Sequence, residues 1–501
     1  GDVRPAVEWS IAAMREAWDR LAYEEGVVLG RRAAPVLELD PDADPALVAG
    51  LHIELSLLTQ YVGDTEEAKR LAARAIDIAR PTGDPGLLAQ AVTARYMWAR
   101  VGVIEPMATA HFEEAIRGLD EVEPLVAARL LITRALERAM NERDGIRAEP
   151  FAREAAHAAV TSNDPPTIML GLFVLASVTL GSPQVGVQLE CVSLADEALG
   201  RLPESERDRV ALDRHRIAVP AMLQVGDRAG AEDAMAGIVR VDSMTGTGRI
   251  PTALLSMWRS LLALAEGRLD DADRHAAELV EMSALDVNFQ NSWAALVFRI
   301  GMERGTAGTF LPIVQGAVDA TPDFVAMQVV LAQAAAAAGE IDAASTVFNR
   351  LAADGFASVP RDPAWSAVLI QLTELCLVLD ATEAAPALYD LLLPFSGQMI
   401  VVAWGVFTPG SADRYLGMLA LVQGRTGEAH ERFRTALALE ESMGFTALAA
   451  WTRYWTARAL AADGDSGAAR QLAAAVQADA ERMGLVWLAT SAADLARAAD
   501  G

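Results

Sequence analysis

The most regular feature of the sequence is a turn followed by small residues at helical spacing. Gly63 and Asp64 form a predicted tight turn, and Ala68, Ala72 and Ala75 follow it at intervals of four and three residues. Residues at this spacing lie on one face of an α-helix. Small side chains on that face let a neighbouring helix pack closely. The pattern therefore predicts a helix that begins after the turn and packs against another helix.

The same pattern recurs along most of the chain. Strong copies follow Gly226, Gly267, Gly339, Asp380, Gly424 and Gly464, and weaker copies lie at 108–115, 148–155 and 191–198. The predicted turns fall at 63, about 103, about 143, about 186, 226, 267, about 305, 339, 380, 424 and 464. Such regular recurrence is typical of helical-repeat proteins, in which each unit buries its apolar face against the next.

The spacing of the turns sets the architecture. With a period of about 40 residues and an added N-terminal pair over 7–37, the chain holds about eleven to twelve helix pairs. We predict an all-α, right-handed superhelical solenoid of antiparallel pairs that spans 1–501 as a single domain. A repeat array couples only nearest neighbours. We therefore expect it to flex as a spring, so that a ligand preferring one curvature would bias the whole array.

Composition supports helices and narrows the partners. Hydrophobic residues make up 52% of the chain, which excludes disorder for its bulk, and abundant alanine favours helix. The net charge of −26 repels phosphate backbones, so direct nucleic-acid binding is not expected. Cys191 and Cys376 lie too far apart in sequence to indicate a disulfide framework, and no apolar leader is visible. A cytoplasmic location is predicted.

Two long uncharged stretches, 165–189 and 391–412, raise the question of membrane spans. Both are interrupted by glycine and proline, whereas a spanning helix needs about 20 apolar residues without such breaks. We predict that both are buried helices with a loop and that the chain has no membrane partner.

One copy of the repeat resembles a known consensus. Leu416 and Gly417 precede Gly424, and Ala429 and Phe433 follow it at the offsets of the tetratricopeptide repeat. The longer period is similar to the tetratricopeptide domain of the maltose-regulon activator. This resemblance implies a helical-repeat binding domain.

A sharper resemblance covers 355–465. The motifs are Asp362-Pro363-Ala364-Trp365, Pro394-Phe395-Ser396-Gly397 and the run from Arg414 to Ala420. They resemble the helical C-terminal region of large actinobacterial signalling proteins, which carry a signal-transduction ATPase coupled to a LuxR-type DNA-binding domain, a nucleotide cyclase or a kinase. That family is glycine-rich near 400–410, where this chain has Trp404 and Phe407.

Catalytic motifs are missing from the sequence. A Walker A loop requires a lysine after glycines, and the single lysine, Lys69, follows none. The six histidines stand too far apart for a zinc motif, and paired carboxylates fall at predicted helix starts, where they favour the helix dipole. We expect no catalytic residue, no metal and no cofactor. The ATPase and effector domains are expected outside this segment.

The candidate binding residues lie on the first helix of each pair, which is expected to line the concave wall. They are Arg414, Tyr415, Met418, Trp451, Tyr454, Arg458, Arg216 and Glu374. Arginine and aromatic side chains are the types that anchor interfaces. The alternative is that Tyr415 and Trp455 only pack between helices while Trp451 caps the array. The segment 95–98 is a second aromatic cluster with the same two interpretations.

Three functions remain open at this stage. The first is a sensor region of a bacterial signalling or transcription regulator, which binds a protein partner or a small-molecule inducer on the concave face. The second is a free-standing tetratricopeptide adaptor. The third is an enzyme built on a helical-repeat frame, which would need a deep pocket with convergent titratable groups.

Overall fold

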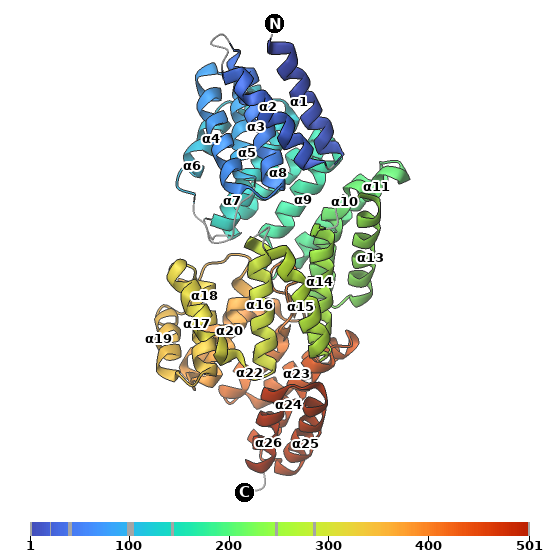
Figure 1. The fold of residues 1–501 in the computed structure, drawn as a ribbon. Coiled ribbons are helices and arrows are strands. Elements are labelled where there is room, and N and C mark those ends of the chain that lie inside the picture. The colour runs from blue at the N-terminus through green and yellow to red at the C-terminus, as the bar shows by residue number, and fades with distance from the viewer. Residues whose placement is uncertain are drawn as a thin grey trace. The chain divides into compact units, whose positions relative to one another are not determined.

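The computed structural model describes residues 3–20, 22–38, 43–97, 105–141, 145–245, 249–283 and 287–498 (Figure 1). They fall into two compact units, each taken here by itself. Unit 1 comprises 1–143 and 147–178, and unit 2 comprises 144–146 and 179–501. A single domain over 1–501 stays a prediction.

Unit 1 consists of helices. Its α-helices are α1 (Val3–Asp19), α2 (Tyr23–Glu38), α3 (Pro45–Tyr61), α4 (Thr65–Ala79), α5 (Pro85–Tyr96), α6 (Ala108–Ile116), α7 (Pro124–Asn141), α8 (Gly145–Ser162) and α9 (Pro165–Val178). Two 3-10 turns, η1 (Arg80–Thr82) and η2 (Leu119–Glu121), join them. In the described part of this unit, closely packed helices are at most two apart in chain order. This is the nearest-neighbour packing of a helical repeat.

Unit 2 continues the helical pattern and adds one small β-ladder. Its first helices are α10 (Val185–Gly200), α11 (Glu204–Val210), α12 (Leu212–Gln224), α13 (Arg228–Thr245), α14 (Arg249–Ala265), α15 (Leu269–Ser283), α16 (Val287–Glu303), α17 (Leu311–Ala320), α18 (Val325–Ala337) and α19 (Ile341–Ala352). The rest are α20 (Trp365–Val378), α21 (Ala385–Leu392), α22 (Ala412–Val422), α23 (Thr426–Ser442), α24 (Thr446–Ala462), α25 (Ser466–Met483) and α26 (Val486–Ala498), with turns η3 (Ala307–Phe310), η4 (Thr382–Ala384) and η5 (Leu393–Phe395). The strands are β1 (Met399–Ile400) and β2 (Gly410–Ser411). The predicted all-α helical-repeat solenoid is confirmed.

Left-handed turns separate the helices where the sequence predicts them. Positive φ angles occur at Gly63, Gly226, Gly267, Gly305, Gly339, Asp380, Gly424 and Gly464. Glycine adopts this conformation without the penalty that a Cβ atom brings. The turn predicted near 186 lies instead at Gly181, with φ 73°. The turns predicted near 103 and 143 lie outside the described residues.

The small residues after each turn form the helix–helix contacts. In the copy after Gly424, Ala429, Phe433 and Ala436 are at most 1% exposed. A Cβ atom at Gly417 would lie 2.5 Å from the ring of Phe433, so only glycine lets the two helices approach this closely. The repeat grid thus predicts the core-facing positions correctly.

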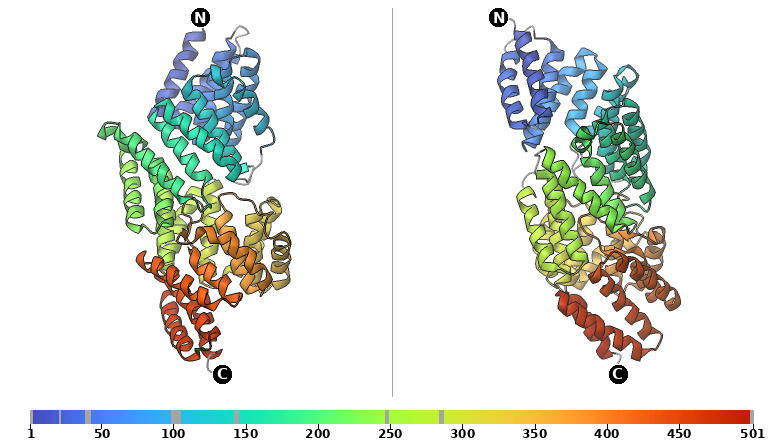
Figure 2. Two further views of the ribbon diagram at one scale, coloured as in Figure 1. Left: turned by 180° about the vertical axis from the view of Figure 1, so that it is seen from behind. Right: turned by 90° about the vertical axis from the view of Figure 1, so that its right-hand side faces the viewer.

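Unit 2 also packs helices that are far apart in sequence. Helix α14 contacts α24 and α16 contacts α26, and in Figure 2 the red C-terminal helices adjoin the green to yellow-green segment. Arg228 donates to the backbone carbonyl of Met443 at 2.8 Å, and Thr446 donates to that of Glu266 at 2.6 Å. The expectation of nearest-neighbour coupling is therefore wrong for unit 2, because its early and late repeats contact each other.

The segment 391–412, predicted as buried helices with a loop, is largely non-helical: it contains the ends of two helices, a short turn and a loop with a small β-ladder, and several of its residues are exposed. Residues 396–411, which we call the strap, form β1, a loop and β2, with Met399 opposite Ser411 in an antiparallel ladder. Proline and glycine prevent helix here, and outside groups satisfy the backbone. Gly397 donates its amide to the Asp413 carboxylate at 2.6 Å, and Trp258 Nε1 donates to the Trp404 carbonyl at 2.8 Å. The stretch 165–189, by contrast, forms α9 and the start of α10. No helix in the described ranges is long and apolar enough to cross a membrane.

Candidate ligand cavity

A cavity of about 190 Å³ lies in unit 2, lined by α16, α20, α22, α24 and α26; we call it the ligand cavity. Seven of the predicted binding residues line it: Glu374, Arg414, Tyr415, Met418, Trp451, Tyr454 and Arg458. Arg216 does not; it lies on α12 and pairs with Asp213 at 2.8 Å. The structure thus brings seven residues together, and their role in binding stays a prediction.

Aromatic side chains form much of the cavity wall. Trp451, Tyr454 and Trp455 lie on one face of α24, as their spacing of three and four residues requires. Trp487 of α26 packs edge-on against Trp451, with ring centroids 5.0 Å apart. Trp451 and Trp455 are at most 8% exposed. Trp451 does not cap the array, because α25 and α26 follow α24 and cover it.

A buried ion-pair chain from α16 lies beside these rings. Trp451 Nε1 donates to Glu303 at 2.9 Å, and Arg299 donates to the same carboxylate at 2.7 Å. Arg299 also donates to Glu374 at 3.3 Å, and Gln333 donates to the other oxygen of Glu374 at 2.7 Å. Both carboxylates of this ion-pair network, Glu303 and Glu374, have hydrogen-bond partners. Buried charges are tolerated under this condition.

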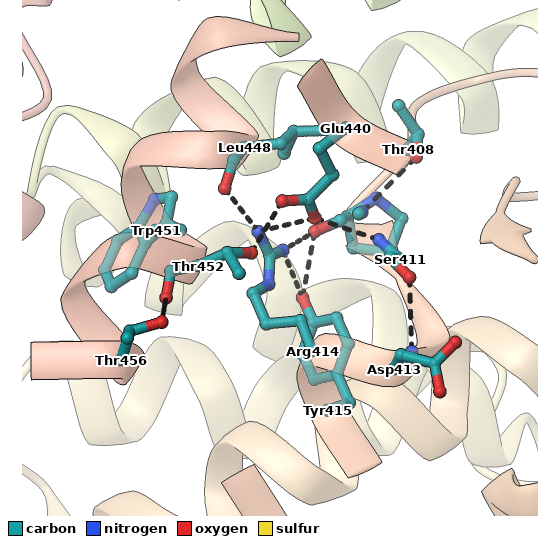
Figure 3. Close-up of polar contacts among 12 residues, drawn as sticks. Thr408, Ser411, Asp413, Arg414, Tyr415, Glu440, Leu448, Trp451, Thr452 and Thr456 are labelled. Atoms are coloured by element: carbon teal, nitrogen blue, oxygen red, sulfur yellow. Dashed lines mark hydrogen bonds and ion pairs between the residues drawn. The ribbon is translucent and has the colours of Figure 1, made fainter. Parts of the chain in front are cut away.

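Arg414 forms a second buried cluster under α24 (Figure 3). Its guanidinium donates to Glu440 at 3.3 Å and to the Leu448 carbonyl at 3.0 Å, and it also donates to the carbonyl of Pro409 in the strap. It donates further to the Tyr415 hydroxyl at 3.2 Å. Glu440 is completely buried. Arg414 is therefore a structural cation whose donors are largely used within the protein.

Tyr415 joins the two clusters. Its hydroxyl lies 3.2 Å from Glu374 Oε1 and 3.0 Å from the Pro409 carbonyl oxygen. Polar contacts thus run from Glu303 on α16, past Arg299, Glu374 and Tyr415, to the strap. The strap in turn contacts α12 and α14 through Gln398 and Trp404.

Burial shifts several pKa values in this region. Burial raises the pKa of Tyr415 and of Tyr454, and burial also raises the pKa of Glu440, against the opposing effect of Arg414. Burial alone would lower the pKa of Arg299, but the carboxylates of Glu303 and Glu374 outweigh it and raise that pKa. The cavity floor therefore keeps a charged arginine and neutral tyrosines at neutral pH.

The three lining arginines differ in what they can offer a ligand. Arg299 and Arg414 are at most 8% exposed and are already engaged with carboxylates. Arg458 is exposed, stacks on the Trp455 ring at 4.5 Å, and forms no ion pair within the described ranges. In those ranges no group of three or more histidine, cysteine or carboxylate side chains could hold a metal. The arrangement suits binding of an apolar group with an anionic end.

Sequence reasoning missed several participants. Arg299, Glu303, Glu440 and Trp487 were not among the predicted residues. A signal was present for the first two, since Arg299 and Glu303 stand four residues apart within an apolar helix, where charges need partners. The second aromatic cluster is only partly described: Tyr96 bonds to His111 at 2.8 Å, and Trp98 lies outside the described residues.

Comparisons with known proteins give a distant structural likeness. No family model and no curated protein matches the chain. It is similar to a crystal structure of the APC/C hetero-tetramer Cut9-Hcn1, at 13% identity, covering 97% of this chain and 95% of that one, with a TM-score of 0.48. It is also similar to the human IFIT1 dimer with PPP-AAAA, at 14% identity, covering 85% and 89%, with a TM-score of 0.29. Likeness at such identities concerns the fold alone.

Proposed function

We propose that this chain is a helical-repeat sensor region of a bacterial signalling or transcription regulator, and that the ligand cavity is its recognition site. The observation that carries the proposal is the cavity itself, which gathers aromatic rings from α22, α24 and α26 and the exposed Arg458 of α24. The cavity also lies largely on the segment 355–465, whose motifs resemble the signalling family.

Signal transfer would use the contacts between cavity and strap. A ligand against Tyr415 and Met418 would favour one arrangement of the polar chain that ends on the Pro409 carbonyl. The strap would pass that preference to α12 and α14, which it contacts through Gln398 and Trp404. A ligand shifts such an equilibrium only by its differential affinity for the two arrangements. This replaces the spring-like mechanism expected from the repeat alone.

The proposal keeps the wider context predicted from the sequence. An ATPase and an effector domain would lie outside residues 1–501, and the chain itself would perform no catalysis. The acidic surface, with a net charge of −26, disfavours direct contact with nucleic acid. A cytoplasmic location is supported by Cys191 and Cys376, which are both buried and are not in a disulfide.

The test uses a variant that fills the cavity from its rim. Val378 lines the cavity on α20 and is 48% exposed, so Val378→Trp should fold while blocking access. Val239→Trp is the matched control, because Val239 is 47% exposed on α13 and does not line the cavity. A chemically diverse set of metabolites and peptides is screened by thermal unfolding against all three proteins.

The expected result is at least one compound that stabilises the wild type and the control but not Val378→Trp. Occupancy at a hundredfold excess over Kd adds about 2.7 kcal/mol to the free energy of unfolding. If every stabilising compound acts equally on Val378→Trp, or if none stabilises the wild type, the cavity is not the recognition site.

A further inference from the structure

The polarity of the ligand cavity changes along α24. Trp451 lies at one end, beside the buried Arg299–Glu303 pair, and Arg458 lies seven residues further, which is about 10 Å along a helix axis. Tyr454 lies between them on α24, and Met418 and Leu377 from neighbouring helices also line the cavity. The apolar part of the cavity is thus closed by a polar network at one end and by Arg458 at the other.

The two ends differ in their remaining capacity for a charged ligand. At the inner end, Glu374 accepts from Arg299 and Gln333, so its oxygens are occupied and its charge is matched. At the outer end, Arg458 has no carboxylate partner in the described part of the chain. Tyr454 and Ser491, whose hydroxyls are neutral, line the cavity together with Arg458. An anionic group is therefore favoured at the outer end.

The guanidinium of Arg458 is oriented by its stacking on Trp455 at 4.5 Å. Contact with the ring leaves guanidinium N–H groups for a ligand, and arginine can bind a carboxylate through two parallel hydrogen bonds. A cationic ligand is disfavoured next to Arg458, whereas the charges of Arg299 and Arg414 are matched by buried carboxylates.

The volume limits the apolar part of the ligand. At about 190 Å³, the cavity is smaller than the roughly 300–1,000 Å³ typical of drug-sized ligands. It accommodates one ring with a short side chain. Trp451 and Trp487 pack edge-on with ring centroids 5.0 Å apart, and both line the cavity, where they offer ring surface to an aromatic group.

We infer that the ligand cavity binds a small single-ring carboxylic acid, with the ring among Trp451, Trp487 and Met418 and the carboxylate on Arg458. This inference rests on the proposed function and specifies its ligand. We infer that the occupant is a free acid. The C-terminal aromatic residue of a protein partner has the same chemistry, and the experiment below distinguishes the two.

The experiment compares three probes on the full chain. They are 3-phenylpropionate, its uncharged isostere 3-phenylpropionamide, and a hexapeptide ending in phenylalanine with a free carboxylate. Affinity is measured by calorimetry and by the change in tryptophan fluorescence. The variants are Arg458→Gln and the matched control Arg453→Gln, since Arg453 lies on the same helix, pairs with Glu441 and does not line the cavity.

The wild type and Arg453→Gln should bind the acid at least tenfold more tightly than the amide, and Arg458→Gln should lose that preference. Exposed Arg458 leaves the fold intact when replaced, which circular dichroism verifies. Equal affinities for acid and amide, or a preference that survives in Arg458→Gln, overturn the inference. Binding of the peptide without the free acid also overturns it and assigns the cavity to a protein terminus. In both cases the proposed function still stands if the screen finds another ligand whose binding Val378→Trp prevents. The proposed function fails only if the screen finds no such ligand.

Discussion

Unit 1 and unit 2 contain the same repeat but use it differently. In the described part of unit 1, helices pack only with near neighbours in the chain, and the core combines alanines with larger aliphatic side chains and a few rings such as Phe112. In unit 2, α14 reaches α24 and α16 reaches α26, and the strap fills space between early and late helices. The same repeat spacing thus occurs in an array with contacts between near neighbours only and in an array whose early and late helices also contact each other.

Contacts between distant repeats pair buried charged groups in unit 2. Arg299 on α16 and Glu374 on α20 meet across 75 residues, and Trp451 on α24 meets Glu303 across 148 residues. Such groups are buried only because distant repeats supply their partners. The difference teaches that the polar network beside the ligand cavity forms where the repeat departs from nearest-neighbour packing.

The largest expected difference between the units is the number of helices that a core substitution destabilises. Arg414→Met leaves Glu440 buried without its cation, so we expect a loss of about 3–5 kcal/mol in the free energy of unfolding. Phe112→Ala in unit 1 removes a buried ring and is expected to lower it by about 3–5 kcal/mol as well. Hydrogen exchange should show Arg414→Met loosening α12 and α14 as well as α22–α24, whereas Phe112→Ala loosens only α4–α7.

The double variant Arg414→Met, Glu440→Gln is the control for charge. With the buried carboxylate removed, it should recover at least about 1 kcal/mol relative to Arg414→Met. If Arg414→Met increases hydrogen exchange only in α22 and α23, then the strap does not couple the early and late helices of unit 2. The two units would then respond to a core defect in the same way.

Low pH should reduce the stability of unit 2 through protonation of the buried His215 on α12. Burial lowers the pKa of His215 to about 4, and its ring is only 7% exposed. The unfolded chain protonates this histidine near pH 6.5, whereas the folded chain protonates it only near pH 4. Neutral His215 therefore makes its full contribution to the free energy of unfolding above pH 6.5. It is lost as pH falls from about 6.5 to about 4, by roughly 3 kcal/mol.

The measurement is urea unfolding of wild type and His215→Phe at several pH values. The planar phenylalanine ring keeps the contact with Gly237, on which the imidazole lies directly. The difference in unfolding free energy between the two proteins should narrow or reverse in favour of the variant as pH falls. A difference that does not depend on pH between 6.5 and 4.5 would contradict a buried neutral His215.

The repeat and its turns could be predicted from the sequence because they depend on local spacing. The glycines at 63, 226, 267, 339, 424 and 464 each adopt positive φ, and the small residues after them are buried. The strap could not be predicted, because the conformation of 396–411 depends on Asp413, Gln224 and Trp258, which lie outside it.

The candidate cavity was predictable in part for the same reason. Arg414, Trp451 and Arg458 recur at positions that the repeat assigns to one helix face, and they line the same cavity. Arg299 and Trp487 join it through α16–α26 packing, which links residues 188 apart in the chain and leaves no periodic signal. Arg216 shares the helix-face position but belongs to an earlier repeat, and it does not line this cavity.

A smaller effect should follow from crowding the strap. Gly405 has a φ of 89°, and a Cβ atom there would lie 2.8 Å from Trp258 Nε1, so Gly405→Ala should lower unfolding free energy by about 2 kcal/mol. Gly397→Ala is the control, because its φ is 81° but no atom lies within 4 Å of the added carbon. Its loss, from backbone strain alone, should be about 1 kcal/mol. Equal losses in chemical denaturation would show that the Trp258 contact adjusts freely.

The smallest effect concerns exposed ion pairs, where the two units should behave alike. In unit 1, Arg80 donates to both oxygens of Glu114 at 2.8 and 3.1 Å; in unit 2, Arg214 does the same to Asp196 at 2.7 and 2.8 Å. Exposed bidentate pairs contribute about 0.2–1 kcal/mol and weaken with salt. Arg80→Gln and Arg214→Gln should each lower unfolding free energy by that amount at low salt and by less at 1 M. A loss well above this for Arg80→Gln would mean that unit 1 also depends on specific cross-links, and its description as packing between near neighbours would no longer be sufficient.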